Sequence, residues 1–167
     1  KLIDAVVAAG AQAVKFQKRT VPIVYSAEEL AKPRAVDKGV LENAIKRGVL
    51  SKDAVGRLQK SDFKDSINGD LKWSLEFIEA EYREIDRYCK EKGIFWFASP
   101  WDEASVDFLE QFDPPCHKVA SAMLTHTGIL KKLRQAGKPV IASTGMSTME
   151  EIKNAVDLLS GIPLVLL

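Results

Sequence analysis

The stretch that most constrains the fold is CHKVASAMLTHTGILKKLRQAGKPVIASTGM, which covers residues 116–146. It begins with a short run that contains Lys118, and a helical pattern follows it. Val140-Ile141-Ala142 then predicts a buried strand. Two strands joined through a helix lie parallel in one sheet and are connected by a right-handed crossover. The stretch therefore predicts an α/β fold with parallel strands.

The same alternation of strand and helix continues on both sides of this unit. The strands predicted from apolar runs are 13–17, 94–98, 116–121, 140–142 and 163–167, and the predicted helices include 1–9, 75–92, 102–112 and one opened by a capping box at Ser147–Glu150. A doubly wound open sheet is compatible with this order, but polar groups at every strand end favour a barrel. A closed barrel needs about eight such units. We therefore expect a partial (β/α)8 TIM barrel that lacks at least the first strand and the last two.

The region from residue 19 to residue 69 interrupts the pattern. Pro22, Pro33 and Gly39 break it, and only modest amphipathic stretches remain. A connection of this length inside a compact domain is more often functional or disordered than a plain link. It has too little apolar sequence for a core of its own, so we expect one domain over residues 1–167. We expect this region to pass over the barrel mouth with short helices.

Composition excludes several classes of protein. The chain has 46% hydrophobic and 28% charged residues and a net charge of +1, which gives no reason to expect nucleic acid or a membrane as a partner. No secretory signal or membrane-spanning run is visible. Cys89 and Cys116 match no zinc or CxxC spacing and predict free thiols in a reducing cytoplasm. Because the chain starts without Met in a helical pattern and stops in an apolar strand, we expect a fragment.

The carboxyl ends of the predicted strands carry polar side chains. These are Lys15 and Gln17, Ser99, Lys118 and Ser121, and Ser143 and Thr144. In parallel α/β folds the ligand lies at these ends. Lysine gives a point charge to phosphate or carboxylate, and hydroxyl groups complete an anion site. Two lysines indicate a small ligand with two anionic groups, although an edge strand with a solvated Lys15 remains open.

The remaining motifs predict no other chemistry. The sequence has no nucleophile elbow, phosphate-binding loop or dinucleotide fingerprint. His117 and His126 lack metal-ligand spacing. His117 neighbours Lys118 in a strand and so faces the helices, which favours a structural role, whereas His126 lies in a polar loop near the strand ends.

Four segments resemble the barrel of the sialic acid (N-acetylneuraminate) synthase family in order and spacing. They are Val14–Gln17, Phe97–Asp102, Lys118–Ser121 and Gly137–Met146. The similarity covers nearly the whole chain except about residues 35–63, which resemble an insertion. It implies a transferase that condenses phosphoenolpyruvate with an N-acylated amino sugar such as N-acetylmannosamine, to give a nonulosonic acid and phosphate. It also implies Mn²⁺ or Mg²⁺ as cofactor, to polarise the sugar aldehyde.

The resemblance also implies roles for individual residues. Those matched to phosphoenolpyruvate binding are Lys15, Ser99, Lys118, Ser121 and Ser143, and those matched to sugar binding are Gln17 and, less directly, Asn68. The metal ligands of the family fall outside residues 1–167, so we expect no metal site here and no activity from this fragment alone. Small-molecule substrates, no nucleic acid, no membrane and a homodimer at full length are the implied partners.

One departure from the family concerns a possible acid–base group. Some members carry an acidic residue two positions after Ser121, where this chain has Met123. That role is therefore not carried over, and the acceptor sugar stays open among sialic, pseudaminic, legionaminic and spore-coat types. Two alternatives also stay open: a Schiff-base aldolase that uses Lys118 or Lys15 as nucleophile, and a non-catalytic sugar- or anion-binding barrel fragment.

Overall fold

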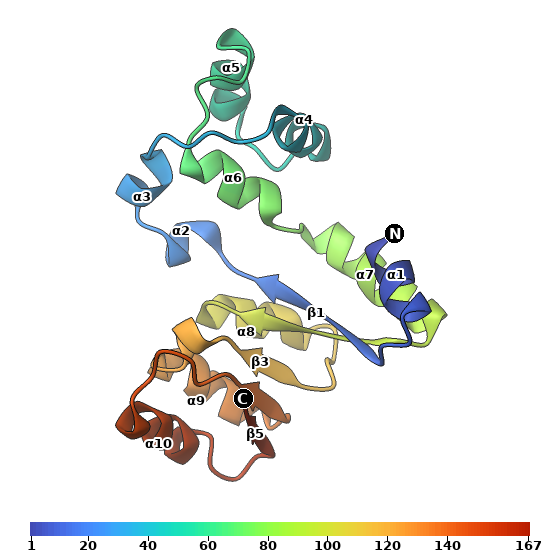
Figure 1. The fold of residues 1–167 in the computed structure, drawn as a ribbon, viewed down its shortest axis with the longest axis vertical. Coiled ribbons are helices and arrows are strands. Elements are labelled where there is room, and N and C mark those ends of the chain that lie inside the picture. The colour runs from blue at the N-terminus through green and yellow to red at the C-terminus, as the bar shows by residue number, and fades with distance from the viewer. The chain divides into compact units, whose positions relative to one another are not determined.

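The computed structural model describes residues 1–167, which separate into two compact units. One unit, here called the barrel unit, combines Lys1–Thr20 with Glu79–Leu167 and contains all five strands (Figure 1). The other, here called the helical unit, is Val21–Ile78 and contains helices only. No helix of either unit combines the length and the apolar character needed to cross a membrane.

The barrel unit alternates strands with helices as predicted. Its strands are β1 (Ala13–Lys18), β2 (Phe95–Pro100), β3 (His117–Val119), β4 (Val140–Ala142) and β5 (Leu164–Leu166). Its helices are α1 (Leu2–Ala8), α7 (Glu79–Lys92), α8 (Glu103–Glu110), α9 (Thr127–Ala136) and α10 (Met149–Leu158), with a short 3₁₀ turn, η1 (Ser121–Met123), after β3.

All strand pairs are parallel, which confirms the predicted α/β class. β1 pairs with β2, and β3, β4 and β5 form a second sheet in that order. β2 and β3 lie side by side without a hydrogen-bonded ladder between them. The register sets Gln17 opposite Ser99 and Lys118 opposite Ile141. Which strands a complete barrel would add remains a prediction.

The main core lies between the second sheet and helices α8 to α10. Its buried members are Val106, Val119, Leu124, Ile129, Leu130, Leu133, Val140, Ala142, Ala155 and Leu159. Successive strand residues point to opposite faces, so Val119 packs against the helices while Lys118 points to the other side of the sheet. Each large apolar side chain buried in this way contributes roughly 1.5–3 kcal/mol. The helix layer therefore fixes which strand residues face the inside.

Two helix boundaries differ from the predictions. The capping box of α10 is formed by Thr148 and Glu151, one residue later than predicted. Both spacings fit the same motif, and Met149, the first residue of α10, is 78% exposed. The helix predicted over 75–92 is also interrupted: residue 76 is extended, and α7 begins only at residue 79. The interruption falls where the chain passes from one compact unit to the other.

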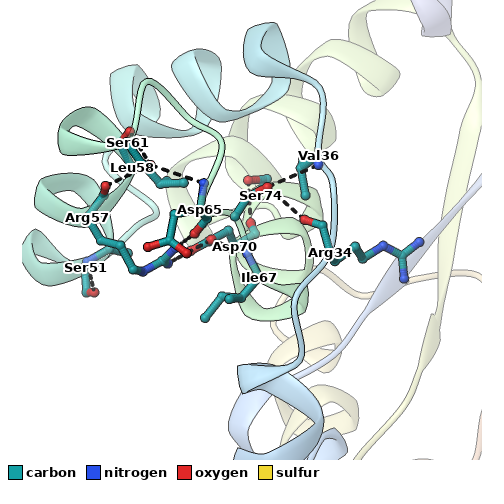
Figure 2. Close-up of polar contacts among 12 residues, drawn as sticks. Arg34, Val36, Ser51, Arg57, Leu58, Ser61, Asp65, Ile67, Asp70 and Ser74 are labelled. Atoms are coloured by element: carbon teal, nitrogen blue, oxygen red, sulfur yellow. Dashed lines mark hydrogen bonds and ion pairs between the residues drawn. The ribbon is translucent and has the colours of Figure 1, made fainter.

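The helical unit contains five short helices, α2 (Val21–Val24), α3 (Ala27–Ala31), α4 (Lys38–Arg47), α5 (Lys52–Lys60) and α6 (Asn68–Leu75). Few apolar side chains are fully buried in it, among them Leu41 and Leu58, as its composition suggested. Buried polar contacts supplement them. Arg57 Nη2 donates to both carboxylate oxygens of Asp70, at 2.8 and 2.9 Å (Figure 2). The compact unit extends beyond the insertion expected at about 35–63, and a single domain over residues 1–167 stays a prediction.

Candidate functional site

Lys118 is the centre of the polar groups at the strand ends. It lies on β3 and is 9% exposed. Its Nζ atom donates to Ser143 Oγ, which follows β4, and to the backbone oxygen of Val119, both at 2.6 Å. An ammonium group has three donors. These two contacts hold the side chain in place and leave one donor for a ligand.

The charge of Lys118 is affected by its surroundings and by Lys15. Burial lowers the pKa of Lys118 below its usual value, and the positive charge of Lys15 lowers the pKa further. Two ammonium groups that repel each other in this way lie within electrostatic reach. The arrangement therefore concentrates positive charge, and a bound anion would reduce the repulsion between the two ammonium groups.

Ser99 and Gln17 lie opposite each other at the carboxyl ends of β2 and β1. Ser99 is 1% exposed, and its Oγ atom has no hydrogen-bond partner. The backbone of Gln17 is fixed from the helix side, because Tyr82 Oη donates to its oxygen at 3.1 Å. The side chain of Gln17 is half-buried.

The loop after β4 approaches the loop after β3. A side chain built on Gly145 would contact Ser121, with 3.7 Å between the two Cβ positions, so the half-buried Ser121 faces this loop. The hydroxyl of Thr144 is engaged elsewhere, since it donates to the backbone oxygen of Leu167 at 2.8 Å. Met146 closes the loop with a φ of 62° and is 95% exposed.

Asn68 belongs to the helical unit, not to the unit that holds the lysines. It is 4% exposed, and its amide group is used locally. Its Nδ2 donates to the backbone oxygen and a carboxylate oxygen of Glu29, both at 3.2 Å, and its Oδ1 accepts from Arg34 at 3.3 Å. A role for Asn68 in sugar binding stays a prediction.

Both histidines have structural contacts. His117 is fully buried on the helix side of β3, and its Nε2 atom lies 2.7 Å from a carboxylate oxygen of Glu110. Burial lowers the pKa of His117, so its neutral form is favoured. This agrees with the structural role expected from its position. His126 caps α9, because its Nδ1 atom accepts from the backbone N–H of Ile129 at 3.3 Å.

Met123, which stands where some family members carry an acidic residue, packs against the hydrophobic core. Residues 1–167 also contain no group of three or more His, Cys, Asp or Glu side chains able to hold a metal ion. The described residues therefore do not fit a metal centre of their own. Metal ligands outside this chain remain a prediction.

Asp102, predicted as the first residue of the helix over 102–112, is the N-cap of α8 and also contacts the end of β1. Its carboxylate accepts from the backbone and hydroxyl of Ser105, at 2.7 and 2.8 Å, and from the backbone and hydroxyl of Thr20, at 2.6 and 3.1 Å. Thr20 follows β1, so the buried Asp102 joins the carboxyl ends of β1 and β2. The helix cap had a local sequence pattern, but the contact with Thr20 spans 82 residues and had none.

A cleft lined by Cys89, Phe95, Trp96, Phe112 and Pro115 opens at the opposite, amino end of β2. Its lining is mainly apolar and includes none of the residues predicted to bind substrate. The polar groups suited to an anion lie instead at the carboxyl ends, where we locate the candidate site.

Comparisons with known proteins agree on one family. Residues 49–167 match the NeuB family. Human N-acetylneuraminate-9-phosphate synthase is 31% identical over 144 residues, which are 86% of this chain and 33% of that protein. Pseudaminic acid synthase of Campylobacter jejuni is 28% identical over 152 residues, which are 91% of this chain and 38% of that protein.

A solved structure has the same fold. The crystal structure of N-acetylneuraminic acid (sialic acid) synthetase from Leptospira borgpetersenii, in complex with citrate, superposes with a TM-score of 0.64 at 23% identity. The superposition covers 98% of this chain and 45% of that chain. This likeness supports the parallel α/β fold. The chain spans about a third of the length of the curated relatives it matches.

Proposed function

The chain belongs to the NeuB family, and from this premise we propose that the protein carrying it condenses phosphoenolpyruvate with an N-acylated amino sugar, such as N-acetylmannosamine. The products are a nonulosonic acid and phosphate. The observation that carries the proposal is the pairing of Lys118, nearly buried and bonded to Ser143, with the nearby charge of Lys15. Relatives named for sialic and pseudaminic acid synthesis support the reaction class and leave the acceptor sugar open.

Phosphoenolpyruvate carries a carboxylate and a phosphate, which suit two ammonium groups. Lys118 and Lys15 provide the positive charge, and the residues that complete the proposed site are Ser99, Ser121 and Ser143. Charge–charge attraction is stronger in the poorly solvated surroundings of Lys118 than in water. We propose that Gln17 and Asn68 contact the sugar.

In the proposed reaction the methylene carbon of phosphoenolpyruvate bonds to the aldehyde carbon of the open-chain sugar. The enol electrons form this bond, and the aldehyde oxygen takes up a proton and becomes a hydroxyl. The carbon that carries the phosphate becomes electron-deficient, and water adds there. Loss of phosphate with cleavage of its C–O bond then gives the keto acid. The lysines contribute by orienting the anion and stabilising its charge.

The Mn²⁺ or Mg²⁺ implied by the family would polarise the aldehyde oxygen when bound. Because residues 1–167 offer no cluster of ligands for it, we place its ligands in flanking sequence and assign it no step here. We also propose that the full-length protein is a cytoplasmic homodimer that acts on small molecules and binds neither nucleic acid nor membrane.

The test uses the product of the complete gene with phosphoenolpyruvate, N-acetylmannosamine and Mn²⁺. We expect release of phosphate that depends on both substrates. If the bridging oxygen of phosphoenolpyruvate is isotopically labelled, the label should appear in the phosphate. Absence of phosphate release with any N-acylated amino sugar contradicts the proposal. A pyruvate adduct trapped by borohydride on Lys118 or Lys15, without metal dependence, would instead support the aldolase.

A further inference from the structure

Three buried side-chain polar atoms in residues 1–167 lack a hydrogen-bond partner: Ser99 Oγ, Trp101 Nε1 and His117 Nδ1. Buried polar groups without partners are uncommon in native proteins, because each has lost its bonds to water without replacing them. His117 lies on the helix side of its strand. Ser99 and Trp101, however, lie two positions apart at the carboxyl end of β2, where the substrate site is proposed.

Trp101 follows directly after β2, at a bend in the chain. Its backbone N–H donates to the backbone oxygen of Lys18 at 2.9 Å, which extends the ladder between β1 and β2 by one step. The guanidinium of Arg19 lies 5.8 Å from the centre of the Trp101 ring. The residues on either side of Arg19 contact the helix side of the sheet, Lys18 at Phe108 and Thr20 at Asp102. The indole beside Arg19 therefore lies on the opposite side, which alternation along β2 also gives to Ser99.

The segment that carries Trp101 is held firmly, so the missing partner is not explained by a loose loop. The next residue, Asp102, is 2% exposed and accepts four hydrogen bonds, two from Thr20 and two from Ser105. Trp101 is thus fixed between a strand and a helix cap. A binding group held in place before its ligand arrives gains affinity, because little ordering remains to be done.

Trp96, which lies on the same strand, provides a comparison, because its indole has a structural role. Its Nε1 atom donates to Asp86 Oδ1 at 3.0 Å, and the residue is 5% exposed. The barrel unit therefore supplies an acceptor to the indole on the helix side and none to Trp101. The two tryptophans form a matched pair within one chain.

We propose that Trp101 is a further substrate-binding residue, whose indole N–H donates, next to the Ser99 hydroxyl, to an anionic oxygen of the substrate. An indole N–H donates only and cannot accept, so it selects an acceptor atom. Carboxylate and phosphate oxygens are strong acceptors. The identification of this anion as phosphoenolpyruvate depends on the proposed function, whereas the anion contact of Trp101 does not.

The test compares Trp101→Phe with Trp96→Phe in the product of the complete gene. Trp101→Phe removes a donor that is unbonded without ligand, so its unfolding midpoint should equal or exceed that of the wild type. Its Kd for phosphoenolpyruvate should rise roughly 10-fold or more. Trp96→Phe should show the opposite pattern, with a lower midpoint and an unchanged Kd.

Indole N–H resonances provide a direct measurement, with each signal assigned by its Trp→Phe variant. Adding phosphoenolpyruvate or inorganic phosphate should shift the signal of Trp101 and leave that of Trp96 in place. The inference is overturned if Trp101→Phe leaves Kd unchanged, or if neither anion shifts the Trp101 signal. If the anion shifts that signal but no sugar leads to phosphate release, the proposed function fails while the Trp101 contact stands.

Discussion

The Nζ atom of Lys118 lies 2.6 Å from the Oγ atom of Ser143, so a side-chain hydrogen bond joins the ends of β3 and β4. The lysine in this pair is nearly buried and has a lowered pKa. The protonation state of Lys118 and the position of its side chain are therefore coupled, and both affect how the proposed site would bind an anion.

Replacing Lys118 with Met should reduce kcat/KM for phosphoenolpyruvate by roughly 100-fold or more, the usual effect of losing a positioned charge partner. Stability should change little, because the substitution also removes a poorly solvated cation. Steady-state kinetics and thermal unfolding of the complete protein measure both. Lys153→Met, at an exposed position on α10, is the control and should leave both unchanged. Full activity in Lys118→Met would contradict the assignment.

The affinity for phosphoenolpyruvate should fall as the pH rises toward 10.5, the ordinary pKa of lysine, because Lys118 loses its proton at a lower pH than that. Folding stability responds in the opposite direction. In this pH window the folded state binds fewer protons at Lys118 than the unfolded state does, so its contribution to the free energy of unfolding rises with pH.

Lys15→Gln tests the cause of this shift. Removing the nearby positive charge should raise the pKa of Lys118 and move the alkaline loss of affinity to higher pH. Calorimetric Kd values measured across the alkaline range provide the comparison. An unchanged midpoint would mean that burial alone sets the pKa.

Asp102→Ala should lower the free energy of unfolding by about 2–4 kcal/mol, because it removes a helix cap and leaves the partners on Thr20 and Ser105 without an acceptor. Urea unfolding measures the loss. Asp107→Ala removes an exposed ion pair with Lys132 from the same helix and should cost less than about 1 kcal/mol. Equal effects of the two substitutions would show that the link between β1 and β2 adds nothing.

Arg57→Met should destabilise the helical unit by about 2–3 kcal/mol, because Asp70 would remain buried without its cation. The expected loss is below that of a fully buried pair, since the side chain of Arg57 is 28% exposed. Amide hydrogen exchange should accelerate within residues 51–75. Lys38→Met, which breaks the exposed pair with Asp62, should leave these rates unchanged. Protection retained in Arg57→Met would contradict this role.

The strand order and most helix ends of the barrel unit were predictable because their determinants are local. Gly137, for example, ends α9 with a φ of 73°, a conformation that glycine adopts without strain. Alternation along β3 likewise separated the helix-facing His117 from Lys118. Such patterns depend on neighbours within a few residues.

The features that escaped prediction depend on distant residues or on overlapping patterns. Thr148–Glu151 and Ser147–Glu150 fit the same capping motif, so the sequence alone did not choose between them. The contact between Thr20 and Asp102 joins residues far apart in the chain. The lack of an acceptor for the indole of Trp101 depends on where all of its neighbours lie in the fold.

The exposed thioether of Met146 has a practical consequence. At 95% exposure, this sulfur is open to hydrogen peroxide, which converts methionine to its sulfoxide, whereas the half-buried Met123 is better protected. Met146 follows directly after the loop of Ser143 and Gly145. The rate of Met146 oxidation, followed by mass spectrometry, would therefore report on binding at that loop, because a bound molecule that covers the sulfur would slow the reaction.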